Sequence, residues 1–391
     1  MPLPVVTLSA RGVDRLRSGH PWIYRSDIAN SAAGPGDLVR VETERGRPLG
    51  TAMWSSTSQI SLRFLGPDDI TDDRVWLEER LQAAMAFRQS IQIDGTAWRL
   101  VNAEGDRLPG LIVDVYGEGA DRIVVLQTLA QAMDRRLPLI TELLVALLAP
   151  AGVLARNDPR VRRLEGLPEQ VDVLHGEVPE QISIVEGGLR YQVNLREGQK
   201  TGSFLDQREN HAAAGRYARG RGLDAFSYHG GFALTMARHC DHVLALDSSA
   251  PAVAQIRANA QLNGLANVEA RDVNVFDELR ELEIARERFD TIVLDPPAFA
   301  KNKASVPRAA AGYKEINLRA LKLLAPGGML VTCSCSSNVD EALFEQILVD
   351  AAADARAVVT VVEKRAQARD HPILLAAPET HYLKCFLLRK L

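Results

Sequence analysis

The chain has 391 residues, of which 46% are hydrophobic and 25% are charged, and its formal net charge is −4. This length exceeds that of one ordinary domain, so two or three domains are expected. The composition excludes a disordered or fibrous protein. The acidic balance argues against a uniformly basic nucleic-acid-binding protein, although local basic patches remain compatible with such a partner.

The sequence contains no clear targeting, membrane or metal-binding signal. Its first residues, MPLPVVTLSARG, lack the basic-then-apolar order of a secretory signal. The longest apolar run, residues 143–155, is interrupted by Pro150 and Gly152 and is shorter than the ~20 residues of a membrane span. A cytoplasmic protein with no membrane partner is therefore expected. No metal is expected either, because the cysteines are few and scattered. They are Cys240, Cys333, Cys335 and Cys385.

The first half of the chain predicts two small domains. Short apolar stretches separated by glycine and proline predict a β-rich domain, with strands at PVVTL, GDLVRVET, RPLGTAMW and QISLRFL. An amphipathic helix is expected over residues 75–90. Residues 98–195 predict a mixed α+β unit with mainly antiparallel strands, including a hairpin turned by Gly117 and Gly119 and a helix over 137–148.

In the second half, from about Gly222, short apolar strands alternate with helices. This alternation predicts a parallel sheet with helices on both faces. The expected strands are GLDAFS, HVLALD, NVEARD, FDTIVLD and MLVTCSCSS, and helices are expected near 278–285, 318–324 and 340–353. Ligands bind beyond the carboxyl ends of the strands in such sheets, so the residues at those ends are the candidate site.

The first three strand ends favour an adenosine ligand. The first strand runs through Asp224, Phe226 and Ser227 into a turn at Gly230, where glycine lets the backbone approach a ligand. The dinucleotide pattern G-x-G-x-x-G is absent. Asp247 ends the second strand, where a carboxylate can bind a ribose diol. Two further candidates are Ser248, beside it, and Asn274, which follows the third strand. A tight turn, a helix cap and a solvated loop are the alternative interpretations.

The last two strand ends carry groups suited to methyl transfer onto a nucleobase. Two prolines follow Asp295 and hold it in a stiff, extended segment. Phe299 then either stacks on a base or packs in the core. This D-P-P-x-aromatic order is typical of nucleic-acid methyltransferases. On the fifth strand, Cys333 and Cys335 face the same side. Cys335 is nearer the end and is expected in the site, whereas Cys333 is expected to be buried.

The segment GQKTGSFLDQREN precedes a helix. Asp206 and Glu209 have the spacing of a capping box. Gln207 and Arg208 are then left to contact a ligand, and Arg208 is suited to clamp a carboxylate such as the methionine end of the cofactor.

These segments, together with DAFSYHGGFAL, VLALDSS, VLDPPAFAKNK, TCSCSS and DHPILLAAPETHYLK, resemble a bacterial family of 23S ribosomal RNA cytosine-C5 methyltransferases over nearly the whole chain. The resemblance implies a PUA domain over 1–72, a central α+β (EEHEE-type) domain over 73–195, and an α/β Rossmann-like class I methyltransferase domain over 196–391. It also implies S-adenosylmethionine as the cofactor and RNA as the partner.

The resemblance also assigns roles to particular residues. Cys335 matches the family's nucleophile and Asp295 its D-P-P acid. The positions that match cofactor contacts are Phe226, Gly230, Asp247 and Asn274. The sequence departs from the family at His229, where Thr or Ala is usual, at Ala298, which is often Lys, and at Cys333, an extra thiol.

The RNA contacts are expected beside the site, at Lys200, Phe299, Lys301, Lys303 and Lys314, although charge runs are often only solvated faces. In the expected mechanism a thiolate adds to C6 of cytosine and activates C5. Three alternatives remain: an amino-group methyltransferase, which needs no cysteine; a non-catalytic RNA-binding factor; and a nucleotide-dependent oxidoreductase, disfavoured by the missing glycine pattern. A homodimer also remains open.

Overall fold

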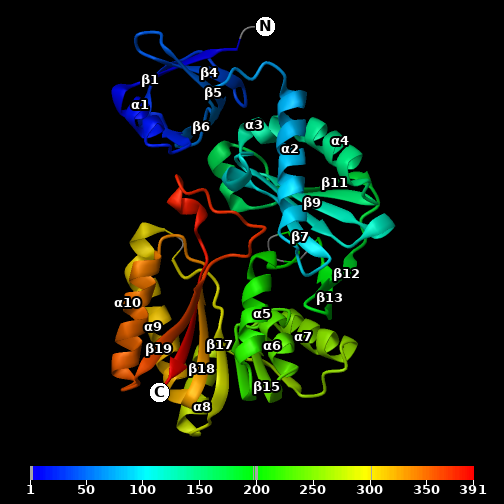
Figure 1. The fold of residues 1–391 in the computed structure, drawn as a ribbon, viewed down its shortest axis with the longest axis vertical. Helices are drawn as coiled ribbons and strands as arrows, with labels where there is room; N and C mark the ends of the chain where they lie inside the picture. The colour runs from blue at the N-terminus through cyan, green and yellow to red at the C-terminus, as the bar shows by residue number, and fades with distance from the viewer. Residues whose placement is uncertain (1–2, 197, 199–200, 301) are drawn as a thin grey trace. The chain divides into compact units, whose positions relative to one another are not determined.

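The structure is a computed structural model that describes residues 3–196, 198, 201–300 and 302–391 (Figure 1). Contacts between residues divide the chain into two compact units. Unit 1 comprises Met1–Ile184, Val193–Leu205 and Arg369–Thr380. Unit 2 comprises Val185–Gln192, Asp206–Ala368 and His381–Leu391.

Unit 1 begins with a six-stranded sheet in the order β2-β6-β5-β4-β1-β3. Its strands are β1 (Val5–Leu8), β2 (Trp22–Tyr24), β3 (Ile28–Ser31), β4 (Leu38–Thr43), β5 (Pro48–Trp54) and β6 (Ile60–Gly66), and helix α1 (Ala10–Arg17) follows β1. The four strands expected from the sequence correspond to β1, β4, β5 and β6. The sequence did not predict α1, β2 and β3.

The rest of unit 1 is built around a five-stranded sheet in the order β11-β10-β9-β8-β7. Only β9 and β10 pair in parallel, so the expected mainly antiparallel unit is confirmed. The elements are α2 (Asp73–Ser90), β7 (Ala97–Asn102), β8 (Leu111–Tyr116), β9 (Ile123–Thr128), α3 (Gln131–Arg135), α4 (Leu137–Leu148), β10 (Gly152–Asn157) and β11 (Gln170–Gly176). A separate two-stranded sheet is formed by β12 (Gln181–Glu186) and β13 (Leu189–Asn194).

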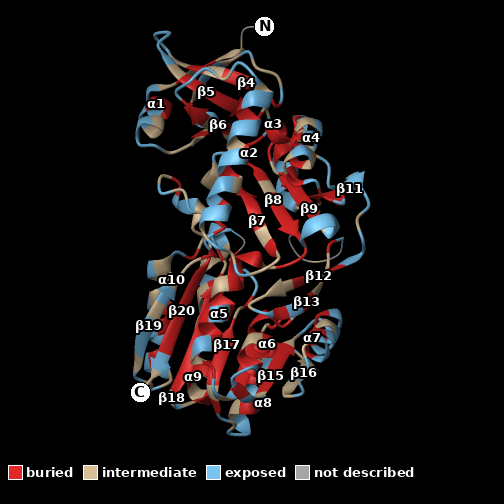
Figure 2. Cartoon of the chain, turned by 45° about the vertical axis from the view of Figure 1, so that its right-hand side comes forward, coloured by how far each residue is buried: buried red, intermediate tan, exposed pale blue. Residues whose placement is uncertain are grey.

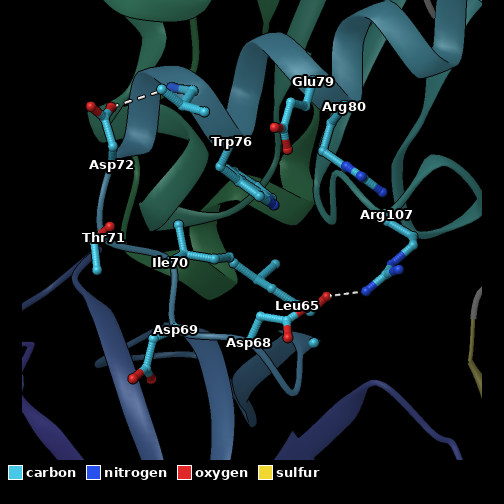
Figure 3. Close-up of a pocket in the computed structure, with 12 residues that line it drawn as sticks. Leu65, Asp68, Asp69, Ile70, Thr71, Asp72, Trp76, Glu79, Arg80 and Arg107 are labelled. Atoms are coloured by element: carbon cyan, nitrogen blue, oxygen red, sulfur yellow. Dashed lines mark hydrogen bonds between the residues drawn. The ribbon is translucent and has the colours of Figure 1, made fainter.

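A pocket of about 390 Å³ lies beside the first turns of α2 (Figure 3). Trp76, which is 9% exposed, forms part of its wall, and Arg107 donates a hydrogen bond to the carbonyl oxygen of Leu65. The charged residues of the lining are Asp68, Asp69, Asp72, Glu79, Arg80 and Arg107. Because carboxylates outnumber guanidinium groups there, this pocket does not favour a phosphate ligand.

Unit 2 is a three-layer α/β structure. Its seven-stranded sheet has the order β16-β15-β14-β17-β18-β20-β19. β20 runs antiparallel to β18 and β19, and the other neighbouring strands pair in parallel. Helices α5, α6 and α7 pack on one side of the sheet and α8, α9 and α10 on the other (Figure 1). The strands are β14 (Gly220–Ala225), β15 (Cys240–Asp247), β16 (Val268–Asp272), β17 (Phe289–Leu294), β18 (Leu324–Ser334), β19 (Val359–Arg365) and β20 (Lys384–Lys390). The helices are α5 (Arg208–Tyr217), α6 (Gly231–Ala237), α7 (Ala250–Leu262), α8 (Val275–Ile284), α9 (Val306–Leu323) and α10 (Glu341–Asp354).

The order of the strands in the sheet of unit 2 determines where the candidate site residues lie. The strand order reverses between β14 and β17, and this is the point at which open α/β sheets bind ligands. The central strands are buried by helices on both faces (Figure 2), which explains their continuous apolar sequences. Residues that follow the carboxyl ends of β14 and β17 therefore emerge side by side from a rigid core.

Among the described residues, no helix is long and apolar enough to cross a membrane.

Candidate active site

The turn after β14 is held in an unusual backbone conformation. Phe226, Tyr228 and Gly230 have positive φ angles of 68°, 51° and 93°. The N–H of Ser227 donates to the carbonyl oxygen of Leu246 on β15, at 2.9 Å. A non-glycine residue with positive φ is uncommon, and two within three residues indicate that the surrounding structure imposes this turn.

Asp224 lies at the base of this turn and is fully buried. The hydroxyl of Ser227 donates to its Oδ2 atom at 2.5 Å, and its Oδ1 atom accepts no hydrogen bond within the described part of the chain. Burial raises the pKa of Asp224 to about 7, against the opposing effect of Ser227 and with a further contribution from the charge of Asp295. A buried carboxyl with an unused acceptor is suited to a cationic group such as an ammonium.

The ends of β15 and β16 carry the remaining adenosine candidates. The carboxylate of Asp247 accepts the N–H of Tyr228 and the N–H of Ser249, both at 2.9 Å, which fixes its orientation. Each oxygen retains a lone pair for a ribose hydroxyl. Ser248 is exposed. Asn274 is the N-cap of α8, and its side-chain oxygen accepts the N–H of Phe276 at 3.0 Å. This capping role, which differs from the solvated loop that was the alternative interpretation, leaves its amide nitrogen for a ligand.

The D-P-P segment and Cys335 meet across β17 and β18. The N–H of Asp295 donates to the carbonyl oxygen of Ala225 at 3.3 Å, joining the ends of β17 and β14. Cys335 follows the last residue of β18 and is half-buried, with its Sγ atom 3.8 Å from the carbonyl oxygen of Pro296. Cys335 therefore lies beside the D-P-P segment, as the sequence predicted.

Cys333 has a different environment. It is fully buried and lies opposite Cys385 in the register between β18 and β20. Burial raises the pKa of the Cys333 thiol well above its usual range. The expectation that Cys333 is a small buried side chain is confirmed.

The segment before α5 differs from the prediction. Asp206 and Glu209 do not form a capping box, because α5 begins at Arg208 with Gln207 as its N-cap and without a side-chain cap. The capping prediction is wrong, since the Asp206 carboxylate accepts the hydroxyl of Tyr382 at 2.7 Å. The side-chain oxygen of Gln207 accepts the amide of Asn210, also at 2.7 Å. The contact of Asp206 with Tyr382, which is distant in sequence, takes the place of the expected local contact with Glu209.

Arg208 belongs to a buried group that also contains a pair the sequence did not predict. His211 and Glu186 lie 2.6 Å apart, and Arg208 is buried nearby. Burial alone would raise the pKa of Glu186, but His211 and, to a smaller extent, Arg208 lower it. His229 is also affected: its burial and then the charge of His211 lower its pKa to about 4. No motif relates Glu186 to His211, because only the fold brings them together.

A second residue missed in the sequence is Lys384, the first residue of β20, which is 2% exposed. Its Nζ atom donates to the carbonyl oxygens of Ser336 at 2.8 Å and Tyr382 at 3.0 Å. The sequence did not predict this strand, although Lys384 is the last residue of the segment DHPILLAAPETHYLK, which contributes to the family resemblance.

The expected RNA contacts have varied environments. Phe299 is half-buried and packs against Tyr313, with ring centroids 4.6 Å apart. Lys303 is exposed, whereas Lys314 forms an ion pair with Asp354 at 2.8 Å. The other two candidates, Lys200 and Lys301, lie outside the described residues. Over the part of the chain that the structure covers, no group of three or more His, Cys, Asp or Glu residues could hold a metal ion.

Comparisons with known proteins identify the family to which the chain belongs. Residues 6–66 match the model of the PUA-like domain, and residues 130–389 match the model of the S-adenosylmethionine-dependent methyltransferase family. Ribosomal RNA large subunit methyltransferase I of Aeromonas salmonicida is 41% identical over 95% of this chain and 95% of its own length. Its counterpart from Vibrio cholerae is 38% identical over 97% and 98%.

Solved structures share the fold. A methyltransferase crystallised in complex with SAH has a TM-score of 0.84 and 23% identity over all of both chains. A SAM-dependent methyltransferase from Streptococcus mutans has a TM-score of 0.83 and 21% identity, again over both chains in full. The chain thus combines a PUA-like β domain with a Rossmann-like domain, and it belongs to the family of S-adenosylmethionine-dependent methyltransferases, among the relatives named ribosomal RNA large subunit methyltransferase I.

Proposed function

We propose that this protein transfers a methyl group from S-adenosylmethionine to C5 of a cytosine in 23S ribosomal RNA, in the cytoplasm. Two observations support 23S ribosomal RNA as the substrate. The relatives above are named for the RNA of the large ribosomal subunit, and a PUA-like segment at residues 6–66 is suited to RNA. The division into domains at 1–72, 73–195 and 196–391 belongs to the same proposal.

The residues at the strand ends fit S-adenosylmethionine. The unused Oδ1 atom of Asp224 suits the methionine ammonium, and the fixed carboxylate of Asp247 suits the ribose diol. The other proposed cofactor contacts are Gln207, Arg208, Phe226, Ser227, Gly230, Ser248, Asn274 and Asp295. When bound, S-adenosylmethionine supplies an electrophilic methyl group on a sulfonium sulfur.

The proposed chemistry uses Cys335 and Asp295. C5 of cytosine is a weak nucleophile, and addition of the Cys335 thiolate to C6 makes C5 enamine-like. Asp295, protonated or sharing a proton with N3, stabilises the charge that develops on the ring. After methylation the C5 proton is removed and the thiol is eliminated, which restores the double bond. A base held within an RNA helix must first be turned out of its stack.

The observation that carries the proposal is the contact between Cys335 and the D-P-P segment, 3.8 Å from Sγ to the Pro296 carbonyl oxygen. Cys335→Ala is expected to abolish methyl transfer while leaving cofactor binding unchanged, whereas Cys333→Ala should retain most activity. Target RNA with 5-fluorocytidine should become covalently trapped on Cys335, because fluorine cannot leave as the proton does. An adduct on Cys333 would instead assign the nucleophile to the other cysteine.

The runner-up is an amino-group methyltransferase, which the D-P-P-x-aromatic order also suits. Full activity of the Cys335→Ala Cys333→Ala double variant would favour it. A non-catalytic RNA-binding factor is the other alternative, and failure to bind S-adenosylhomocysteine in calorimetry would favour that reading. A homodimer is also proposed, and sedimentation of the full chain tests it.

A further inference from the structure

A buried lysine lies next to the proposed nucleophile. Lys384 begins β20, directly opposite Ser334 in the antiparallel register with β18, and Cys335 is the next residue along from Ser334. The Nζ atom of Lys384 donates to the carbonyl oxygen of Ser336, on the other side of Cys335. The lysine side chain is therefore fixed across the short segment that carries the thiol.

The position of Ser336 is itself strongly determined. Its hydroxyl contacts the Tyr313 hydroxyl at 3.0 Å and accepts the N–H of Ala300 at 3.1 Å. Ala300 ends the segment that begins with Asp295. Lys384 is therefore bonded to a residue that links the end of β18, helix α9 and the D-P-P segment.

Among the described residues, the charges that act on this lysine come from Cys335, Asp340 and Glu341. Burial lowers the pKa of Lys384 to about 8, and the largest opposing effect comes from the negative charge of Cys335, followed by Asp340 and Glu341. Burial, and to a smaller extent the charge of Cys335, raise the pKa of Tyr313, so its hydroxyl is neutral near pH 7. Interaction between two charges is reciprocal. Because a thiolate at Cys335 would stabilise the ammonium of Lys384, the ammonium would stabilise that thiolate by the same free energy.

We propose that Lys384 is a positioning residue that maintains Cys335 as a thiolate ready to attack the base. This inference rests on the proposed function of Cys335. The S–H proton leaves to solvent while Lys384 keeps its own three protons, and the sulfur lone pair then forms the S–C6 bond. When the thiol is eliminated, that electron pair returns to sulfur and the ammonium stabilises it again. Nucleophilic cysteines commonly depend on a neighbouring cation in this way.

The full-length protein offers a matched control on the same strand. Lys390, at the other end of β20, is also bonded to two backbone carbonyl oxygens, those of Leu321 at 2.8 Å and Leu324 at 2.7 Å. It lies six residues from Lys384, roughly 20 Å along an extended strand. Lys384→Met and Lys390→Met therefore each remove a donor from two backbone carbonyl oxygens, but only the first removes a cation near Cys335.

The test is the rate at which iodoacetamide alkylates Cys335 as a function of pH, followed by mass spectrometry of the peptide that contains it. In Lys384→Met the apparent pKa of alkylation should rise by about one unit, which means a roughly tenfold lower rate below that pKa. Lys384→Arg should restore the original profile, and Lys390→Met should not change it. Identical profiles for the two Met variants would overturn the proposal.

Two measurements keep the result interpretable. Binding of S-adenosylhomocysteine and the thermal melting curve report whether each variant is folded. If Lys384→Met is not folded, the alkylation profile of Lys384→Arg provides a second test. Alkylation does not depend on the product formed on RNA. If Cys335→Ala retains methyl transfer, the proposed cytosine-C5 chemistry is wrong, but the shift in the alkylation profile still shows that Lys384 acts on Cys335. If Cys335→Ala is inactive and the profile of Lys384→Met is not shifted, only the proposed role of Lys384 is wrong.

Discussion

At the scale of single residues, Asp224 links cofactor binding to protonation. Its pKa is raised from 3.8 to about 7 because it is buried, so at pH 6 the carboxyl is mostly protonated in the free protein. A bound ammonium favours the carboxylate. We therefore expect binding of S-adenosylhomocysteine to release a proton at pH 6, and the affinity to increase with pH until about pH 7 and then level off. Calorimetry in two buffers of different ionisation enthalpy measures this release.

The same shift affects the stability of the free protein. Between pH about 4 and 7 the folded protein retains a proton that the unfolded chain has lost, so the contribution of Asp224 to stability falls as pH rises through this window. Asp224→Asn should remove both the proton release and this part of the pH dependence. Asp247→Ala should weaken binding by about 1–3 kcal/mol but keep the release. Binding without proton release in the unaltered protein at pH 6 would contradict the assignment.

The residue types at the strand ends could be predicted, but their partners could not. Asp224 and Asp247 lie at the ends of strands, and Asp295 and Cys335 directly follow strands, so their position at one edge of the sheet follows from the alternation of elements. Nothing local in the sequence indicates that Lys384 lies beside Cys335, because the two are 49 positions apart. Such contacts depend on strand order, which local patterns do not determine.

At the scale of elements, the start of α6 is closely packed. A Cβ atom on Gly231 would lie 2.4 Å from Cε1 of the buried His211, which is held by Glu186. Gly231→Ala should therefore destabilise the protein by about 1–3 kcal/mol, as overpacking does, and should weaken cofactor binding by moving the preceding turn. Urea denaturation of the variant, with and without S-adenosylhomocysteine, measures both effects.

Gly312 provides the control for this substitution. It lies within α9, and its added Cβ would meet the Phe299 ring at an ordinary distance of 3.4 Å. Gly312→Ala should be neutral or stabilise the helix by up to about 1 kcal/mol. If both variants were equally stable, the contact with His211 would not be the constraint on Gly231.

Local sequence signals predict the boundaries of some helices and strands more accurately than those of others. Asp72 caps α2 and Asp340 caps α10, and both helices begin within two residues of the expected positions. The expected helix over 318–324 instead begins at Val306, because the segment RAAAGYK has no large aliphatic residue to reveal a period. The sequence did not predict β19, whose side chains are mostly exposed and whose place at the sheet edge is set by pairing with β20.

At the scale of the whole molecule, the acidic net charge requires that RNA binding depend on local groups. Lys303 and Arg308 are exposed next to the D-P-P segment, whereas Lys314 is already paired with Asp354. Replacing Lys303 and Arg308 with Gln should lower RNA affinity and reduce the slope of log K against log salt by ~0.7–0.9 for each lost phosphate contact.

Lys314→Gln is expected to change that slope less, since its charge is balanced in the free protein. Filter binding of ribosomal RNA fragments over a series of salt concentrations measures both variants. An unchanged slope in the Lys303 Arg308 double variant would show that these two charges face solvent and do not contact RNA.

The position of β20 has a consequence for the order of synthesis. β18 ends at residue 334 and β19 at residue 365, yet both pair with a strand that starts at residue 384. While the chain emerges from the ribosome, these two strands present unpaired backbone edges, which can pair with other chains. The strand that closes the sheet also carries Lys384. A polypeptide terminated before β20 would therefore lack the ammonium beside Cys335 and would be prone to aggregate. Such an incomplete chain is expected to be both inactive and insoluble.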